Sequence, residues 1–245
     1  MIMIPKDRSS VNVMKGNFYG TFFRFVQFII RKMSPTYHVQ IPNQISGPVA
    51  YISHHQNTFG PFVIMLWFPK SLHAWILHVF LNQTACYKQY AKYTFTKRKG
   101  MNKHLAKICA LPLSYLIAKL LHSGKGIPVY RGSRQIMQTF NQSVAALQKG
   151  EDIVIFPDID YSDTSSRTNA MYEGFLYLEK YYYKITGQHV CFVPLYASKS
   201  KKVIIADHPI HFRDGEDFNK ERKIVYQKIH DQLNLLAKKC GDLNE

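Results

Sequence analysis

Three short stretches of the chain gather side chains that can move protons or hold negative charge. His54 and His55 are adjacent imidazoles, and the ordinary pKa of histidine suits a general base near neutral pH. Arg131 and Arg134 precede a predicted helix, where guanidiniums, free backbone N–H groups and the helix dipole together favour an anion. The third stretch carries three carboxylates, Asp158, Asp160 and Asp163.

Each of these stretches follows an apolar run that predicts a buried strand. The runs cover residues 48–53, 126–130 and 152–156, and two more strands are predicted at 190–196 and 202–206. Working groups in an α/β sheet belong at the carboxyl ends of the strands. We therefore expect the imidazoles, guanidiniums and carboxylates to meet at one edge of the sheet.

Helical patterns separate the predicted strands. Ser133 is expected to cap a helix that ends at Gly150, and further helices are predicted near 171–184 and 217–239. This alternation predicts an α/β fold with a central mixed, largely parallel sheet flanked by helices.

The blocks after these strands resemble, in order and spacing, those of the glycerolipid acyltransferase family that includes lysophosphatidic acid acyltransferase. The family's first block, N-H-x-S-x-x-D, aligns with residues 54–60 and places the catalytic His on His55. Its second block, G-I-P-V-x-R, is matched in full from Gly126 to Arg131, with Arg131 on the phosphate-binding Arg. The third block, F-P-E-G-T-R-S, meets 156–162, and the fourth, V-P followed by a hydrophobic residue, meets Val193-Pro194-Leu195.

The resemblance implies an acyltransferase-like fold and an O-acyl transfer without a cofactor or metal. A His takes the proton of an acceptor hydroxyl as the hydroxyl attacks an acyl thioester carried by acyl-CoA or acyl carrier protein. His55 would be this base. The residues expected to bind substrate are Asn57, Gly126, Arg131 and Arg134.

The sequence departs from the family in the first and third blocks. Gly60 occupies the position of the Asp that orients the catalytic imidazole, and losing such a partner costs on the order of 10⁴ in rate in the serine protease triad. We hypothesise that Asp158 or Asp160 replaces this carboxylate from across the cleft. Tyr161 stands in place of the family's third-block Arg, which puts a glycerol phosphate acceptor in doubt and leaves a polyol, sugar or amine headgroup open.

Positive charge is concentrated in the first three fifths of the chain. Residues 8–150 contain 18 Lys and Arg and no Asp or Glu, whereas residues 151–245 contain 13 Lys and Arg and 15 Asp and Glu. A merely solvated surface normally mixes both signs. The basic part is therefore expected to face lipid headgroups, nucleic acid or an acidic carrier protein.

Residues 17–33 have the spacing of an amphipathic helix. Such a helix can lie in a membrane interface or pack on the domain. The expected membrane contacts are Phe18, Phe22, Phe25 and Arg24. We expect residues 1–46 to form this helical segment, residues 47–245 to form the acyltransferase-like domain, and the protein to associate peripherally with an anionic membrane surface on its cytoplasmic side.

Other features weaken alternative classes of protein. The four Cys are widely spaced without a C-x-x-C pair, so the sequence predicts neither a disulfide framework nor a thiol zinc site. No secretion signal is predicted, and no run of 18 uninterrupted apolar residues occurs.

Three hypotheses remain, and the oligomeric state is open. The first is a membrane-associated acyltransferase with His55 as base, and the second is a catalytically silent acyl- or lipid-binding protein of the same fold. The third, a nucleic-acid binder, lacks a recognisable reading motif.

Overall fold

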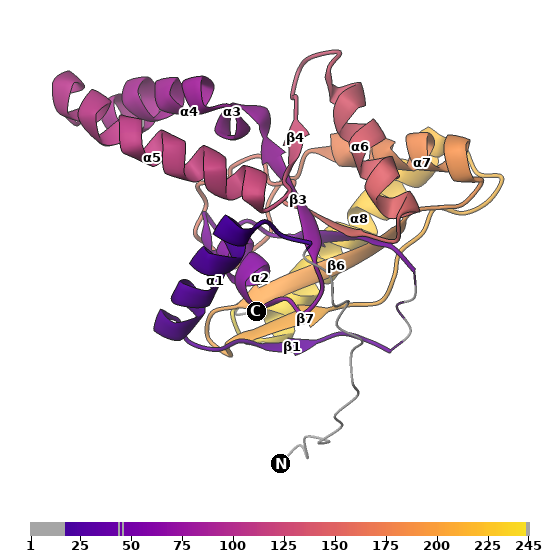
Figure 1. Ribbon diagram of the computed structural model, residues 1–245. Coiled ribbons are helices and arrows are strands. Elements are labelled where there is room, and N and C mark those ends of the chain that lie inside the picture. The colour runs from indigo at the N-terminus through magenta and orange to yellow at the C-terminus, as the bar shows by residue number, and fades with distance from the viewer. Residues whose placement is uncertain (1–17, 44, 46, 244–245) are drawn as a thin grey trace.

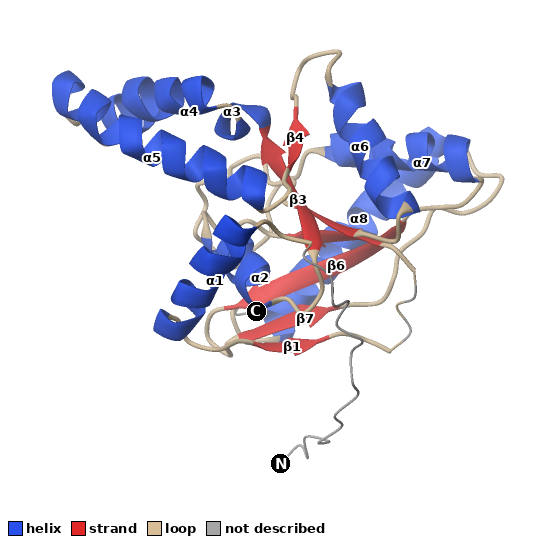
Figure 2. Cartoon of the chain, viewed as in Figure 1, coloured by secondary structure: helices blue, strands red, loops and turns tan. Residues whose placement is uncertain are grey.

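The computed structural model describes residues 18–43, 45 and 47–243. Its centre is a seven-stranded sheet in the order β1-β7-β6-β2-β5-β3-β4 (Figure 2). The strands are β1 (His38–Gln40), β2 (Val49–Ser53), β3 (Leu72–Leu77), β4 (Ile127–Val129), β5 (Asp152–Ile155), β6 (Cys191–Ser198) and β7 (Val203–Ala206). Every neighbouring pair is parallel except β6 and β7, which are antiparallel. The predicted mixed, largely parallel sheet is confirmed.

Helices cover both faces of this sheet (Figure 1). They are α1 (Thr21–Met33), α2 (Phe59–Trp67), α3 (His78–Leu81), α4 (Gln83–Gln89), α5 (Lys103–Ser123), α6 (Ile136–Gln148), α7 (Leu178–Thr186) and α8 (Phe218–Lys239), together with a π-helical segment η1 (Tyr90–Arg98) and a 3-10 turn η2 (Glu173–Tyr177).

The two faces of β2 show how the core is divided. Ala50 and Ile52 point into the cluster formed with α6, α7 and α8, whereas Val49 and Tyr51 point into the cluster that contains α2. All four side chains are fully buried, because successive residues of a strand face opposite sides of a sheet that is covered on both. The loop that follows β2 is therefore anchored in the most buried part of the molecule.

The segment α3, α4, η1 and α5 connects β3 to β4 along the chain and projects from the sheet as an arm (Figure 1). In the sequence, the apolar stripe over residues 113–121 predicts a helix with Pro112 in its first turn. Instead Asn102 caps the helix by accepting a hydrogen bond from the His104 backbone N–H, and Pro112 lies inside it. By length and composition α5 also qualifies as a membrane-spanning helix, and only 22% of its apolar window is buried.

The described part of the 1–46 segment is attached to the sheet domain on one face. Tyr19 exchanges hydrogen bonds with the backbone of Leu72, and Arg31 donates from Nε to the Leu66 carbonyl at 2.7 Å. The segment also contributes β1, which pairs with β7, in addition to its helix. Residues 1–17, including Asp7, lie outside the described residues.

The outer face of α1 differs from the predicted membrane face. Phe18 packs edge-on against the His73 ring, and Phe22 lies under the Lys119 ammonium at 5.0 Å, so these two rings contact the protein. Arg24 and Phe25 are exposed, and their contact with a membrane stays a prediction. The apolar side chains exposed on α1 are Phe25, Phe28, Ile29 and Met33.

Candidate functional site

The loop after β2 turns sharply before α2 begins. Gln56 and Asn57 both have positive φ angles, 44° and 60°, a conformation that costs energy for residues other than Gly. The turn is closed by a hydrogen bond from the Gly60 N–H to the His55 carbonyl at 3.0 Å. As a result His54 points into the protein, whereas His55 lines a cavity on the other side.

His54 is buried between two hydrogen-bond acceptors. Its Nδ1 lies 2.5 Å from Asp158 Oδ1, and its Nε2 lies 2.9 Å from the Ser165 carbonyl oxygen. A carboxylate and a carbonyl both accept, so the ring donates from both nitrogens and carries a positive charge. Burial opposes this charge, but the hydrogen bond and the charge of Asp158 outweigh it and raise the pKa of His54. The positive charge of the His54 imidazolium and the negative charge of the Asp158 carboxylate therefore neutralise each other.

Asp158 therefore contacts a different ring from the one expected. Its second oxygen, Oδ2, accepts a hydrogen bond from the backbone N–H of His55 at 2.8 Å, so it fixes the main chain at His55 rather than the imidazole. Asp160 is exposed and accepts from the backbone N–H and hydroxyl of Ser162. In the part of the chain that the structure describes, no carboxylate hydrogen-bonds to the His55 ring. The predicted pairing of that ring with Asp158 or Asp160 is absent.

The His55 ring sits among apolar groups and beside positive charge. Its Nδ1 is buried without a hydrogen-bond partner. The centres of the Phe156 and Tyr161 rings lie 5.8 and 6.2 Å from the centre of the imidazole. Burial lowers the pKa of His55 to about 4, with a counteracting effect from Asp158 and further lowering by His54 and Arg131. His55 is consequently a neutral imidazole at pH 7, free to accept a proton but weakly basic.

Gly60 leaves no room for the carboxylate that the family resemblance places there. A Cβ atom at this position would lie 2.2 Å from the His54 carbonyl oxygen and 3.1 Å from that of His55. Both neighbours are backbone atoms held by the turn. The departure at position 60 is thus built into the backbone of the site.

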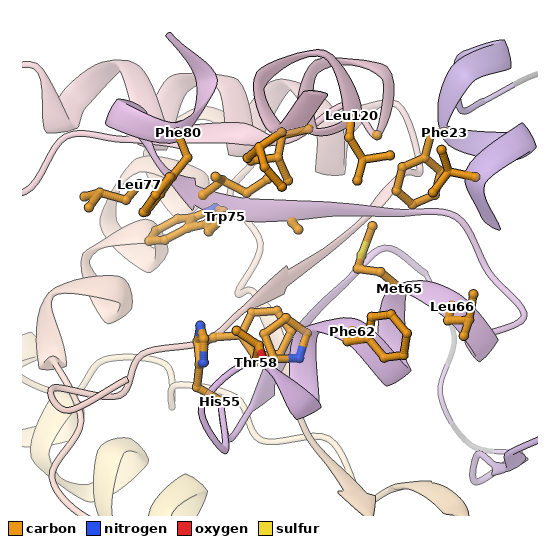
Figure 3. Close-up of a pocket in the computed structure, with 18 of the residues that line it drawn as sticks. Phe23, His55, Thr58, Phe62, Met65, Leu66, Trp75, Leu77, Phe80 and Leu120 are labelled. Atoms are coloured by element: carbon orange, nitrogen blue, oxygen red, sulfur yellow. The ribbon is translucent and has the colours of Figure 1, made fainter. Parts of the chain in front are cut away.

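An apolar cavity of about 460 Å³ extends away from His55. Figure 3 shows its two walls: Trp75, Leu77, Phe80, Leu120 and Phe23 face His55, Thr58, Phe62, Met65 and Leu66 across the space. The walls come from α1, α2, β3 and α5, with Phe80 from α3. A cavity of this size and lining is typical of sites for small amphiphilic molecules.

Arg131 is the one charged side chain among the described residues that line this cavity. Its guanidinium carbon lies 4.3 Å from the centre of the Tyr172 ring, a cation–π contact that limits its orientation. Its charge lowers the pKa of His55, and both side chains line the same cavity. The predicted proximity of the imidazole and Arg131 is present.

The remaining predicted site residues do not line the cavity. Arg134 is exposed ahead of α6, and Asn57 is part of the turn after His55. Gly126 has a packing role, since a Cβ there would lie 2.3 Å from the Cδ1 atom of Ile76, itself a cavity residue. No described group of three or more His, Cys, Asp or Glu is arranged to hold a metal ion.

Much of the cavity wall was not predicted from the sequence. Strand β3 supplies Trp75, Ile76 and Leu77, and α2 supplies Phe62 and Met65. The available signal was the short apolar run over residues 74–77, which is consistent with a buried strand.

Comparisons with known proteins provide little further identification. No family model matches the chain, and no curated protein matches it. Among solved structures, the chain is similar to the 1-acyl-sn-glycerophosphate (LPA) acyltransferase PlsC from Thermotoga maritima, with 9% sequence identity and a TM-score of 0.45 over 88% of this chain and 77% of that one. Similarity at this level assigns no residue and no activity.

Proposed function

We propose that the protein is a membrane-associated acyltransferase that moves a fatty acyl group from a thioester donor to the hydroxyl of a lipid-like acceptor. The observation that carries this proposal is the apolar cavity that has the His55 imidazole and the Arg131 guanidinium at the same site. An acyl chain would fill the cavity, because its methylenes would meet a lining that is mostly apolar. Its thioester carbonyl would then lie beside the polar side chains.

In the proposed reaction, the acceptor oxygen attacks the thioester carbonyl carbon while His55 accepts the hydroxyl proton. The tetrahedral intermediate then collapses, the carbon–sulfur bond breaks, and His55 returns the proton to the leaving thiolate. Arg131 would stabilise the negative charge that develops on the carbonyl oxygen. Asp158 would act as a positioning residue, because it holds the His55 backbone N–H at 2.8 Å and not the ring.

The absence of a carboxylate partner for the His55 ring lowers the expected rate of acyl transfer. A carboxylate partner fixes the tautomer of a catalytic imidazole and stabilises its charged form, and its loss in the serine protease triad costs about 10⁴ in rate. The unpartnered Nδ1 of His55 has neither benefit. We expect slow transfer, measurable with excess enzyme rather than at trace concentration.

The test is thiol release from acyl-CoA and from acyl carrier protein thioesters with a panel of hydroxyl acceptors. His55→Ala should abolish acceptor-dependent release. The control His208→Ala changes an exposed imidazole outside the cavity and should leave release unchanged. Full activity in the His55 variant would exclude a general-base role for this residue.

A second candidate function is acyl-chain binding without turnover. It is favoured by the unpartnered Nδ1 of His55 and by the backbone crowding that excludes a carboxylate at Gly60. Retained binding of an acyl-CoA with no thiol release under any acceptor would select this candidate.

Association with an anionic membrane is proposed for the outer face of α1. Its four exposed apolar side chains are accompanied by the cations Arg24, Arg31 and Lys32, a combination that suits the boundary between headgroups and acyl chains. Acyl-CoA or acyl carrier protein would reach such a site from the cytoplasmic side.

Vesicle flotation tests this association. The protein should float with vesicles that contain anionic lipid, and less with neutral ones. Changing Phe25 and Phe28 together to Ser should abolish flotation, whereas Ile224→Ser, on the exposed side of α8, should not. Equal flotation of both variants would remove α1 from the proposal.

A further inference from the structure

The charge at the polar end of the cavity is not balanced by the protein. Arg131 has no carboxylate partner among the described residues, and its guanidinium packs instead on the Tyr172 ring. Asp158, the carboxylate that holds the His55 backbone, is already neutralised by the His54 imidazolium. Arg131 is exposed to solvent and lines the cavity, so its unpaired guanidinium can bind an anionic head group whose chain enters the cavity.

The other titratable groups near this end do not supply that anion. Asp160 and Asp163 are held in their own turns, where the N–H groups and hydroxyls of Ser162 and Ser165 donate to them. His55 is neutral, and the remaining titratable group that lines this end is the phenol of Tyr161. Neither Asp160 nor Asp163 lines the cavity, so the charged group that the described lining offers to a ligand is the Arg131 guanidinium.

We infer that the cavity binds a long-chain fatty acid in its unesterified form, with the carboxylate on Arg131 and the alkyl chain between α2, β3 and α5. A carboxylate carries one negative charge and matches the planar donor fork of a single guanidinium. A phosphate monoester carries a larger charge, and the second cation expected for it, Arg134, lies outside the cavity. This inference rests on the proposed function only in that the fatty acid would occupy the space assigned to the acyl chain of the donor.

The bound acid would have two consequences. It would compete with the acyl donor, because one cavity cannot hold both chains. Its negative charge would also raise the pKa of His55, opposing the effects of burial and of Arg131. A free acid would thus inhibit transfer by occupying the cavity.

The test compares head groups on one chain. Binding of tetradecanoate, tetradecanol and methyl tetradecanoate, each below its aggregation concentration, is followed by the fluorescence of Trp75, which lines the cavity. The measurements use the full chain with Trp67→Phe, so that one tryptophan reports. The acid should bind about 10- to 150-fold more tightly than the alcohol or the ester, as expected for hydrogen bonds to a charged group.

Arg131→Gln should reduce the affinity for tetradecanoate to that for tetradecanol and leave the alcohol unchanged. Arg134→Gln, an exposed guanidinium nearby in sequence, should leave the preference for the acid intact. Equal binding of acid and ester by the unsubstituted site would overturn the inference, as would an equal loss in both Arg variants. Tighter binding of tetradecanoyl lysophosphatidate, weakened by Arg134→Gln, would overturn it in favour of a phosphate site.

Failure here is separable from failure of the proposed function. A preference for the acid without any thiol release retains the fatty-acid site and rejects the transferase. Thiol release without a preference for the acid retains the transferase and rejects the fatty-acid site.

Discussion

Replacing Gly60 by Ala should destabilise the protein far more than a single added methyl group normally does. The new Cβ would lie 2.2 Å from the His54 carbonyl oxygen, well inside the 3.0 Å that real Cβ atoms keep from their neighbours. A side chain could rotate away, but this carbonyl belongs to the turn that Gln56 and Asn57 already hold at positive φ. The backbone itself must move.

The size of the effect follows from this crowding. Overpacking typically costs 1–3 kcal/mol, and a rigid backbone neighbour places Gly60→Ala at the upper end, about 3 kcal/mol. For a domain of this length, each kcal/mol lowers the melting temperature by about 2–4 °C, so we expect a decrease of about 6–12 °C. The same shift would displace His55 and reduce thiol release.

Thermal unfolding followed by circular dichroism and calorimetry measures this decrease. Gly174→Ala is the matched control, since a Cβ there meets nothing within 4 Å and the residue does not have a positive φ. The control should melt within about 2 °C of the unsubstituted protein, as surface substitutions usually do. A Gly60→Ala protein that melts as the control does would refute the crowding argument, and a Gly60→Asp protein with faster transfer would refute the claim that the turn excludes a carboxylate.

Three further predictions concern titratable residues. Asp158→Ala leaves the buried His54 without its partner and should lower the free energy of unfolding, measured with denaturant, by about 3–5 kcal/mol. The effects of Asp158→Ala and His54→Ala should not add in the double variant, and additive effects would contradict a coupled pair. Burial lowers the pKa of His189, but its hydrogen bonds to the carboxylates of Glu179 and Asp214 outweigh burial and raise the pKa. The contribution of these bonds to stability is therefore present below about pH 6.5 and is lost as the pH rises through the raised pKa. His189→Asn should therefore lower the melting temperature more at pH 5.5 than at pH 9, and an equal decrease at both would exclude this linkage. His55 should show no titration near pH 6.5 in NMR spectra, because its pKa is lowered to about 4; a midpoint near 6.5 would contradict the burial described for it.

The sheet was largely predictable because its central strands are buried on both faces. Runs such as residues 152–156 are apolar after the first residue, and a covered parallel sheet accommodates them. Strand β3 was not predicted, because His73 interrupts its apolar run. In the structure the His73 ring hydrogen-bonds to the Glu151 carboxylate and the Lys125 carbonyl. Pro112 was misleading for a similar reason, since it lies within α5 rather than at the start of a helix.

The site was predictable in part of its residues but not in its pairings or in its apolar wall. The strand ends did bring His55, Arg131 and Asp158 to one region, as the order of the blocks implied. Which imidazole meets Asp158 depends on the positive φ angles of Gln56 and Asn57, and Asn adopts that conformation more often than most residues whereas Gln does not. The steric role of Gly60 likewise depends on a backbone approach that composition cannot reveal.

The most direct measurement of the central claim is a crystal structure with a ketone analogue of palmitoyl-CoA, in which a methylene separates the sulfur from the carbonyl. We expect the alkyl chain to fill the cavity between α2 and α5, with the carbonyl close enough to His55 for one hydroxyl oxygen to bridge them. An alkyl chain bound elsewhere, with the cavity empty, would contradict the proposed transfer site.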